Sequence, residues 1–164
     1  MRFDKFTLKS QELIQEVQNL AAERNHQQME PEHFLMVMMT DTDGIARSIL
    51  SKLGISTDGL VQEISSALGK LPTITGVRDV YLSPESKAIL DAAFTEAMGM
   101  KDEYVSVEHV LLALADTKDG PASKILHQHG ITREKLLKAL MDIRGTQRIT
   151  DPNPEEKYQA LDKF

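Results

Sequence analysis

The chain has no cysteine and no tryptophan among its 164 residues, and aromatic residues make up only 5 % of it. The lack of cysteine excludes a disulfide framework, a thiolate metal site and thiol chemistry. Apolar runs such as Phe34 to Met39 are far shorter than the ~20 residues that span a bilayer. The first residues, Met1 to Lys5, do not open an apolar secretory signal, because Lys9, Glu12 and Glu16 place charges in the next segment. These absences favour a cytoplasmic protein.

A strong charge of one sign is also missing. The net charge is −6, and acidic and basic residues alternate without a basic run. Such a chain offers no electrostatic footprint for a phosphate backbone, so nucleic acid is not an expected partner. The 41 % of hydrophobic and 27 % of charged residues are ordinary for a globular domain.

Sequence motifs for catalysis are absent as well. Gly69-Lys70 lacks both the upstream glycine and the following hydroxyl of a phosphate-binding loop, so we expect no ATP site in this chain. No serine or cysteine nucleophile pattern accompanies His33 or His109. We therefore predict that the chain by itself is not an enzyme and holds no metal or other cofactor.

The sequence is an internal duplication. His33 superposes on His109 at an offset of 76 residues, and the same offset holds without gaps elsewhere. It pairs Glu32 with Glu108, Thr7 with Ser83, Gly44 with Gly120, Gly54 with Gly130 and Leu60 with Leu136. Two copies of one fold unit are the expected result.

Each half carries four segments with apolar residues at i, i+3, i+4 and i+7, the pattern of amphipathic helices. We predict an all-α fold, an eight-helix bundle made of two pseudo-symmetric four-helix repeats. The predicted organisation is repeat 1 (1–70), a connecting loop (71–80), repeat 2 (81–144) and a linker that starts a further helix (145–164).

Capping residues predict where the helices begin and end. Thr7 and Ser83 suit the N-caps of the first helices, and Ser83 is followed by a proline that fits a first turn. We place the second helices from about Pro31 and Val107, and the third helices after Asp43 and Asp119. We expect the third helices to stop at Gly54 and Gly130, and Ser56 and Thr132 to cap the fourth.

The last twenty residues differ from both repeats. A turn-rich segment from Gly145 to Pro154 precedes a fresh helical pattern from Glu155 to Phe164. We expect this helix to have no partner in this chain and the protein to continue beyond it.

Several short motifs together resemble the duplicated N-terminal domain of the Clp ATPases, most closely the ClpB type. They are Phe6-Thr7, Glu30–His33, Val107–His109, Lys70–Pro72 and Asn153–Leu161. The resemblance covers nearly the whole chain, and its last motif is similar to the entry into a first ATPase domain. Leu71-Pro72 and the last motif favour ClpB, and the protease-associated ClpC and ClpA types are the alternative.

The resemblance implies the fragment's context. The whole protein would be a hexameric AAA+ disaggregase of the stress response that binds ATP and magnesium in absent ATPase domains. It would refold aggregated polypeptides in the cytoplasm with the DnaK system, and its first ATPase domain would carry a coiled-coil insertion. The chain itself would be the mobile domain that engages substrates.

The resemblance also implies candidate binding residues: Thr7, Glu32, Ser83, Asp102 and Glu108. In ClpC-type relatives, matching positions form two symmetric pockets for phosphorylated arginine. A hydroxyl at a helix N-terminus can bind an anion, and a nearby carboxylate can hold a guanidinium. Ser83 replaces the usual threonine, and Glu30-Pro31 departs from the ClpC pattern. A polypeptide groove is therefore the function that we expect.

A groove for many sequences requires adaptable apolar surface, and the chain has eight methionines. Met98, Met100 and Tyr104 precede the second helix of repeat 2 and are candidates for this surface. The helical spacing of Met36, Met38 and Met39 instead predicts core positions.

Other readings of these residues stay open. Glu32 and Glu108 suit the first turns of helices, where a carboxylate stabilises the helix dipole. They could also be the paired carboxylates of a hydrolase, although pseudo-symmetry predicts that they lie in separate, equivalent sites. His26, Glu30 and His33 lack a metal-binding pattern, and His33 and His109 are expected to be hydrogen-bonded structural residues.

Overall fold

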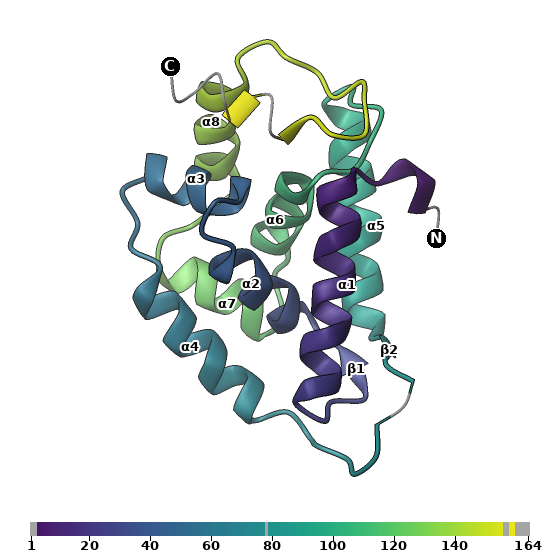
Figure 1. Cartoon of the computed structure of the whole chain (residues 1–164). Coiled ribbons are helices and arrows are strands. Elements are labelled where there is room, and N and C mark those ends of the chain that lie inside the picture. The colour runs from purple at the N-terminus through teal and green to yellow at the C-terminus, as the bar shows by residue number, and fades with distance from the viewer. Residues whose placement is uncertain (1–2, 78, 156–157, 160–164) are drawn as a thin grey trace.

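The computed structural model describes residues 3–77, 79–155 and 158–159. In this part of the chain there are eight α-helices, one 3-10 helix and two short strands (Figure 1). Their bounds are η1 (Phe3–Lys5), α1 (Leu8–Glu23), β1 (Gln28–Met29), α2 (Pro31–Thr40), α3 (Ile45–Lys52), α4 (Asp58–Gly69), β2 (Tyr81–Leu82), α5 (Pro84–Gly99), α6 (Val107–Asp116), α7 (Pro121–Gln128) and α8 (Arg133–Arg144). The predicted eight-helix bundle of two four-helix repeats is confirmed.

The helix boundaries follow the capping residues closely. The Thr7 hydroxyl accepts from the Ser10 amide at 3.2 Å, and the Ser83 hydroxyl accepts from the Ser86 amide at 3.0 Å. The predicted starts of α2 and α6 at Pro31 and Val107 are confirmed.

At the fourth helices only one predicted cap is confirmed. The Thr132 hydroxyl accepts from the Lys135 amide at 3.3 Å at the start of α8. Ser56 as the cap of α4 is wrong: Thr57 holds that position, in helical backbone geometry and with no side-chain capping bond. Helical geometry at the cap turns the hydroxyl away from the free amides, which the residue type does not reveal. The turns at Gly54 and Gly130 have φ of +70° and +72°, as predicted for glycine.

Two small β pairings join the repeats, and helical periodicity does not signal them. β1 pairs in parallel with β2, so that Met29 faces Leu82, and an isolated bridge joins Phe6 to Val105. At the offset of 76 residues these two pairings are copies of one another. Each first helix is thus entered from a segment that pairs with the other repeat.

Helices α2 and α6 form the centre of the core. Phe34, Leu35 and Met39 of α2 are fully buried, as predicted, and Met36 and Met38 are buried with them. Helix α6 is buried from Glu108 to Ala115 and packs against α5, α7 and α8. A helix that is apolar on nearly all sides requires such surroundings.

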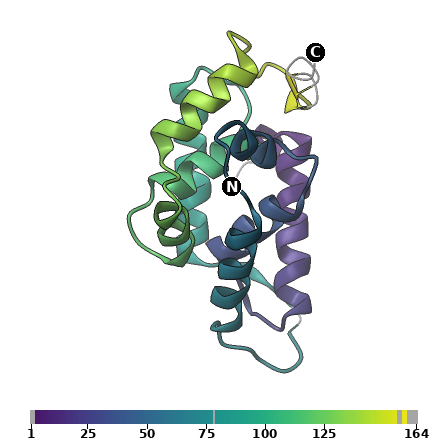
Figure 2. The same ribbon diagram turned by 90° about the vertical axis from the view of Figure 1, so that its left-hand side faces the viewer.

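The connecting loop and the C-terminal segment lie at opposite ends of the molecule (Figures 1 and 2). The C-terminal segment returns to the end where α1 begins, and the Leu8 amide donates to the Pro152 carbonyl at 2.8 Å. Ile149 and Tyr158 are buried. The prediction that this segment has no partner in the chain is therefore wrong. Most of the helix expected from Glu155 to Phe164 lies outside the described residues. No helix in the described ranges is long and apolar enough to cross a membrane.

Candidate functional site

Two equivalent junctions form where a first helix of one repeat begins beside a second helix of the other. At the α1–α6 junction, the Thr7 amide and the Ser10 hydroxyl donate to the Val105 carbonyl at 2.9 and 2.8 Å. At the α5–α2 junction, the Ser83 amide and the Ser86 hydroxyl donate to the Met29 carbonyl at 3.1 and 2.7 Å. This arrangement follows from the two β pairings, in each of which a segment of one repeat pairs with the other repeat.

The predicted site residues divide between these junctions. Thr7, Asp102 and Glu108 belong to the α1–α6 junction, whereas Ser83 and Glu32 belong to the α5–α2 junction. All five are buried. Burial raises the pKa of Glu32, and the neighbouring Glu30 and Glu85 carboxylates add to the rise. Glu32 and Glu108 occupy different junctions, so the structure does not assemble the paired carboxylates of a hydrolase.

Asp102 is the centre of a buried network at the α1–α6 junction. Its carboxylate accepts from His109 Nε2 at 2.8 Å, from Arg144 Nη2 at 2.6 Å and from the Ile149 amide at 3.0 Å. Burial alone would raise the pKa of Asp102, but these three donors outweigh it and lower the pKa to about 2. The Ser106 amide donates to His109 Nδ1 at 2.9 Å, which leaves the His109 proton on Nε2.

The copy of this network in repeat 1 contains two histidines. The Glu30 amide donates to His33 Nδ1 at 2.8 Å, and His33 Nε2 lies 2.8 Å from His26 Nδ1. Burial, then the proximity of His26 and Arg24, lowers the pKa of His33 to about 4. In the described residues no group of three or more metal-ligating side chains occurs. Both histidines are hydrogen-bonded structural residues, as expected of His33.

The C-terminal segment fills the α1–α6 junction. The Thr7 hydroxyl donates to the Glu155 carboxylate at 2.6 Å, and the Tyr158 hydroxyl donates to the Glu108 carboxylate. Burial and the charge of Glu108 raise the pKa of Glu155 to about 7. Arg144 Nη1 lies 3.8 Å from Glu108 and Arg144 Nη2 lies 2.6 Å from Asp102, so one guanidinium lies near two of the three carboxylates at this junction.

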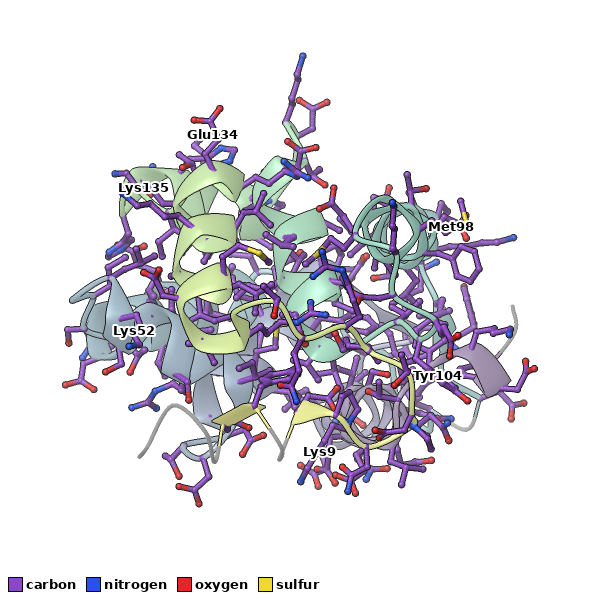
Figure 3. The ribbon with its side chains drawn as sticks, turned by 90° about the horizontal axis from the view of Figure 1, so that it is seen from above. Lys9, Lys52, Met98, Tyr104, Glu134 and Lys135 are labelled. Carbon is purple, nitrogen blue, oxygen red and sulfur yellow. The ribbon has the colours of Figure 1, made fainter. Side chains whose placement is uncertain are left out.

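The methionines and the tyrosine predicted for an adaptable surface lie near the end of α5 and after it. Met98 is 60 % exposed, whereas Met100 and Tyr104 are half-buried against the core. Figure 3 shows Met98 and Tyr104 on one side of the molecule and Glu134 and Lys135 on another. Phe94, one helical turn before Met98, is also exposed.

A surface cavity of about 620 Å³ opens between α1, α2, α3 and the C-terminal segment. We call it the α1–α3 cavity. Its apolar lining consists of Leu13, Val37, Met38, Ile45, Ala46 and Val107. Its acidic rim consists of Glu12, Glu16, Asp41 and Asp43, which are exposed. Lys9, Glu155 and Gln159 complete one wall.

Sequence reasoning missed this cavity because its residues come from four helices, the connection between α2 and α3, and the C-terminal segment. One local signal was available, since α1 places the exposed Glu12 and Glu16 beside the buried Leu13. That pattern alone marks only the boundary of a solvated helix face.

Comparisons with known proteins agree with the geometry. The family described as the Clp repeat (R) N-terminal domain matches residues 5–129. The chaperone protein ClpB of Bacillus cereus is 36 % identical over an alignment that covers 100 % of this chain and 19 % of that protein. The chain thus spans about a fifth of the length of the curated relatives that it matches.

Solved structures show the same fold. The N-terminal domain of Hsp104 from Candida albicans superposes with a TM-score of 0.80 at 22 % identity, covering 92 % of this chain and 99 % of that domain. A complex of a ClpV N-domain with a VipB peptide superposes with a TM-score of 0.61 at 20 % identity, covering 85 % and 86 %.

Proposed function

Because this chain belongs to the family of Clp repeat N-terminal domains, we propose that it recognises polypeptide substrates for a ClpB-type ATP-dependent disaggregase. In this proposal the chain is not catalytic. ATPase domains elsewhere in the protein, assembled as a hexamer, bind ATP and magnesium and pull on the substrate. The partners are unfolded or aggregated polypeptides and the DnaK system, and the site of action is the cytoplasm.

The α1–α3 cavity is the observation that carries this proposal. Its floor is apolar, and Val37 and Val107 are the half-buried residues in it that can contact a bound segment. Its rim contains four carboxylates that favour basic residues. An unfolded segment with apolar and basic side chains has the complementary chemistry. Because the cavity offers few specific polar contacts, we expect it to bind many polypeptide sequences weakly.

The family supports peptide binding as a mode of action. The solved ClpV N-domain complex contains a VipB peptide. Docking of an adaptor, as in a ClpC- or ClpA-type unfoldase, is the second candidate. The exposed Phe94 and Met98 on α5 favour it, since they form an apolar patch apart from the residues of the cavity.

A titration of the chain with an unfolded model protein tests the proposal. Backbone amide shifts followed by NMR are expected to cluster on the α1–α3 cavity. Glu12→Lys should weaken binding several-fold because it reverses a rim charge, whereas Glu134→Lys, an equally exposed change on α8, should not. Shifts confined to Met98 and Phe94 would favour adaptor docking, and no shifts at high client concentration would contradict polypeptide binding.

A further inference from the structure

Two helix N-termini converge at the α1–α6 junction, and a carboxylate occupies the space between them. The Glu155 side chain is 1 % exposed and accepts hydrogen bonds from the Thr7 hydroxyl and the Val107 amide. Thr7 is the N-cap of α1, and Val107 is the first residue of α6. The helix N-termini offer donors to an acidic side chain, while burial and the Glu108 carboxylate raise the pKa of Glu155, so we call this position the acid site.

A second feature next to this acid site recognises a hydroxyl on an aromatic ring. The Glu108 carboxylate is fully buried and accepts from the Tyr158 hydroxyl. The Arg144 guanidinium lies 5.6 Å from the centre of the Tyr158 ring, within the range of a cation–π contact. Glu108 Oε1 has no hydrogen-bond partner within the described ranges, so the pocket retains a free acceptor.

The two bound groups come from one helical turn. The Tyr158 amide donates to the Pro154 carbonyl at 3.3 Å, the i to i−4 bond of a helix. Residues three apart in a helix lie on one face, so Glu155 and Tyr158 enter the junction together.

We propose that the α1–α6 junction is a docking pocket for a helical turn that presents an acidic residue and, three positions later, a tyrosine. Residues 149–155 and 158–159 of this chain occupy the pocket in cis. The specificity follows from the partners: the acid site selects the acidic side chain, and Glu108 with Arg144 selects the hydroxyl and the ring.

Three hydrogen bonds from backbone amides hold the N-terminal end of the occupant. The Leu8 amide donates to Pro152 at 2.8 Å, the Glu103 amide donates to Ile149 at 2.8 Å, and the Ile149 amide donates to Asp102 at 3.0 Å. While they are formed, the pocket is closed to other polypeptides. A peptide of the same chemistry binds only after this segment detaches. This pocket borders the α1–α3 cavity, because Val107 and Glu155 line both, but Glu108 and Arg144, which hold the tyrosine, do not line the cavity. The docking of the segment is therefore tested separately from the function proposed for the cavity.

The pseudo-symmetric copy does not share this occupant. At the α5–α2 junction, Ser83 and Glu32 have no acidic residue and tyrosine bound as a pair within the described residues. Its buried network lacks an arginine, because the position equivalent to Arg144 is Leu68. The docking pocket is therefore a property of repeat 2 meeting α1, and not of the repeat as such.

Hydrogen exchange in the full chain tests the docked state. Tyr158→Ala should speed exchange of the Leu8 and Glu103 amides by roughly 10-fold or more, because both amides donate to the segment. Tyr81→Ala, which removes an exposed tyrosine next to the other junction, is the matched control and should leave both amides unchanged. Unchanged exchange in Tyr158→Ala would overturn the proposal.

A peptide in trans tests the recognition itself. A labelled peptide with the sequence of residues 150–164 should bind the Tyr158→Ala chain and bind the wild-type chain at least about 10-fold more weakly, as expected for a closed pocket. The same peptide with alanine for its tyrosine should not bind. Equal binding to both chains, or binding that ignores the tyrosine, contradicts the pocket. If Tyr158→Ala does not fold, Tyr158→Phe serves, since it removes only the hydroxyl; exchange at Leu8 equal to wild type would then overturn the proposal.

Discussion

The His26–His33 pair of repeat 1 and the Asp102–His109 pair of repeat 2 occupy equivalent positions with different chemistry. In both, the ring nitrogen of the second residue lies 2.8 Å from its partner. The backbones before them agree as well, since the preceding residues have φ of 61° and 60°. One pair is neutral, whereas the other contains a carboxylate bonded to Arg144.

This difference shows how two copies of one fold unit can acquire different buried chemistry. The backbone before each pair, the caps of the first helices and the histidine tautomer are the same in both repeats, because they depend on local hydrogen bonds. Charge is added only in repeat 2, where Arg144 reaches both Asp102 and Glu108. The same network holds Ile149, and so the C-terminal segment docks at one junction of two.

The largest effect is expected when the residues of one buried pair are replaced by those of the other. Asp102→His gives repeat 2 the residue of repeat 1 and leaves the buried Arg144 without its closest acceptor. We expect a loss of about 3–5 kcal/mol in the free energy of unfolding, measured by urea denaturation. His26→Asp is the reciprocal control and should cost less, because Arg24 lies nearby. A loss below about 1 kcal/mol for Asp102→His would show that the network contributes little.

The next largest effect is expected at low pH, where the two repeats should lose stability at different pH values. The folded-state pKa of His33 is about 4, below its ordinary value of 6.5, because burial, His26 and Arg24 oppose protonation. Its stabilising effect is complete above 6.5 and is lost as the pH falls toward 4. Asp102, held at about 2, loses its effect only between 3.8 and 2. The Glu30 amide, which donates to His33, should therefore lose exchange protection at a higher pH than the Ser106 amide. The reverse order would contradict this assignment.

Docking of the C-terminal segment should respond to pH in the opposite direction. Burial and Glu108 raise the pKa of Glu155 from 4.5 to about 7 in the folded chain, with Thr7 the only hydroxyl donor to it in the described ranges. A raised carboxyl pKa stabilises docking fully below about 4.5 and loses that effect as the pH rises through about 7. The Leu8 amide, corrected for intrinsic exchange, should be less protected at pH 8 than at pH 6. Glu155→Gln removes the titrating group, so a pH response that persists in this variant would show that a group other than Glu155 causes it.

The smallest expected difference lies at the fourth helices. Thr132→Ala removes a capping bond of α8 and should cost about 1 kcal/mol of unfolding free energy. Ser56→Ala, at the equivalent position, should have almost no effect, because Thr57 is the cap residue of α4 and makes no side-chain capping bond. Thermal unfolding of the two variants measures the difference. Equal losses would show that the two helix starts are alike in solution.

The helices and their duplication were determined by the sequence itself. Apolar spacing, proline and glycine positions and capping hydroxyls act within one or two turns, so Thr7, Ser83 and Gly54 could be interpreted without a partner. The prediction of Ser56 as the cap of α4 was wrong because backbone geometry, and not residue type, decides which hydroxyl reaches a free amide. The resemblance selected Thr7, Asp102 and Glu108, but it did not reveal that they share one junction.

Only the tertiary structure determined which helices of the two repeats meet at each junction and which residues fill that junction. The pairing of Phe6 with Val105 joins residues about a hundred positions apart, and no local pattern marks it. The same holds for Tyr158, whose hydroxyl meets Glu108 only after α6 and α8 have packed. A tyrosine and a glutamate in a polar segment are equally suited to solvent. Their burial is determined by the space, the charge of Arg144 and the two helix N-termini that the folded core brings together.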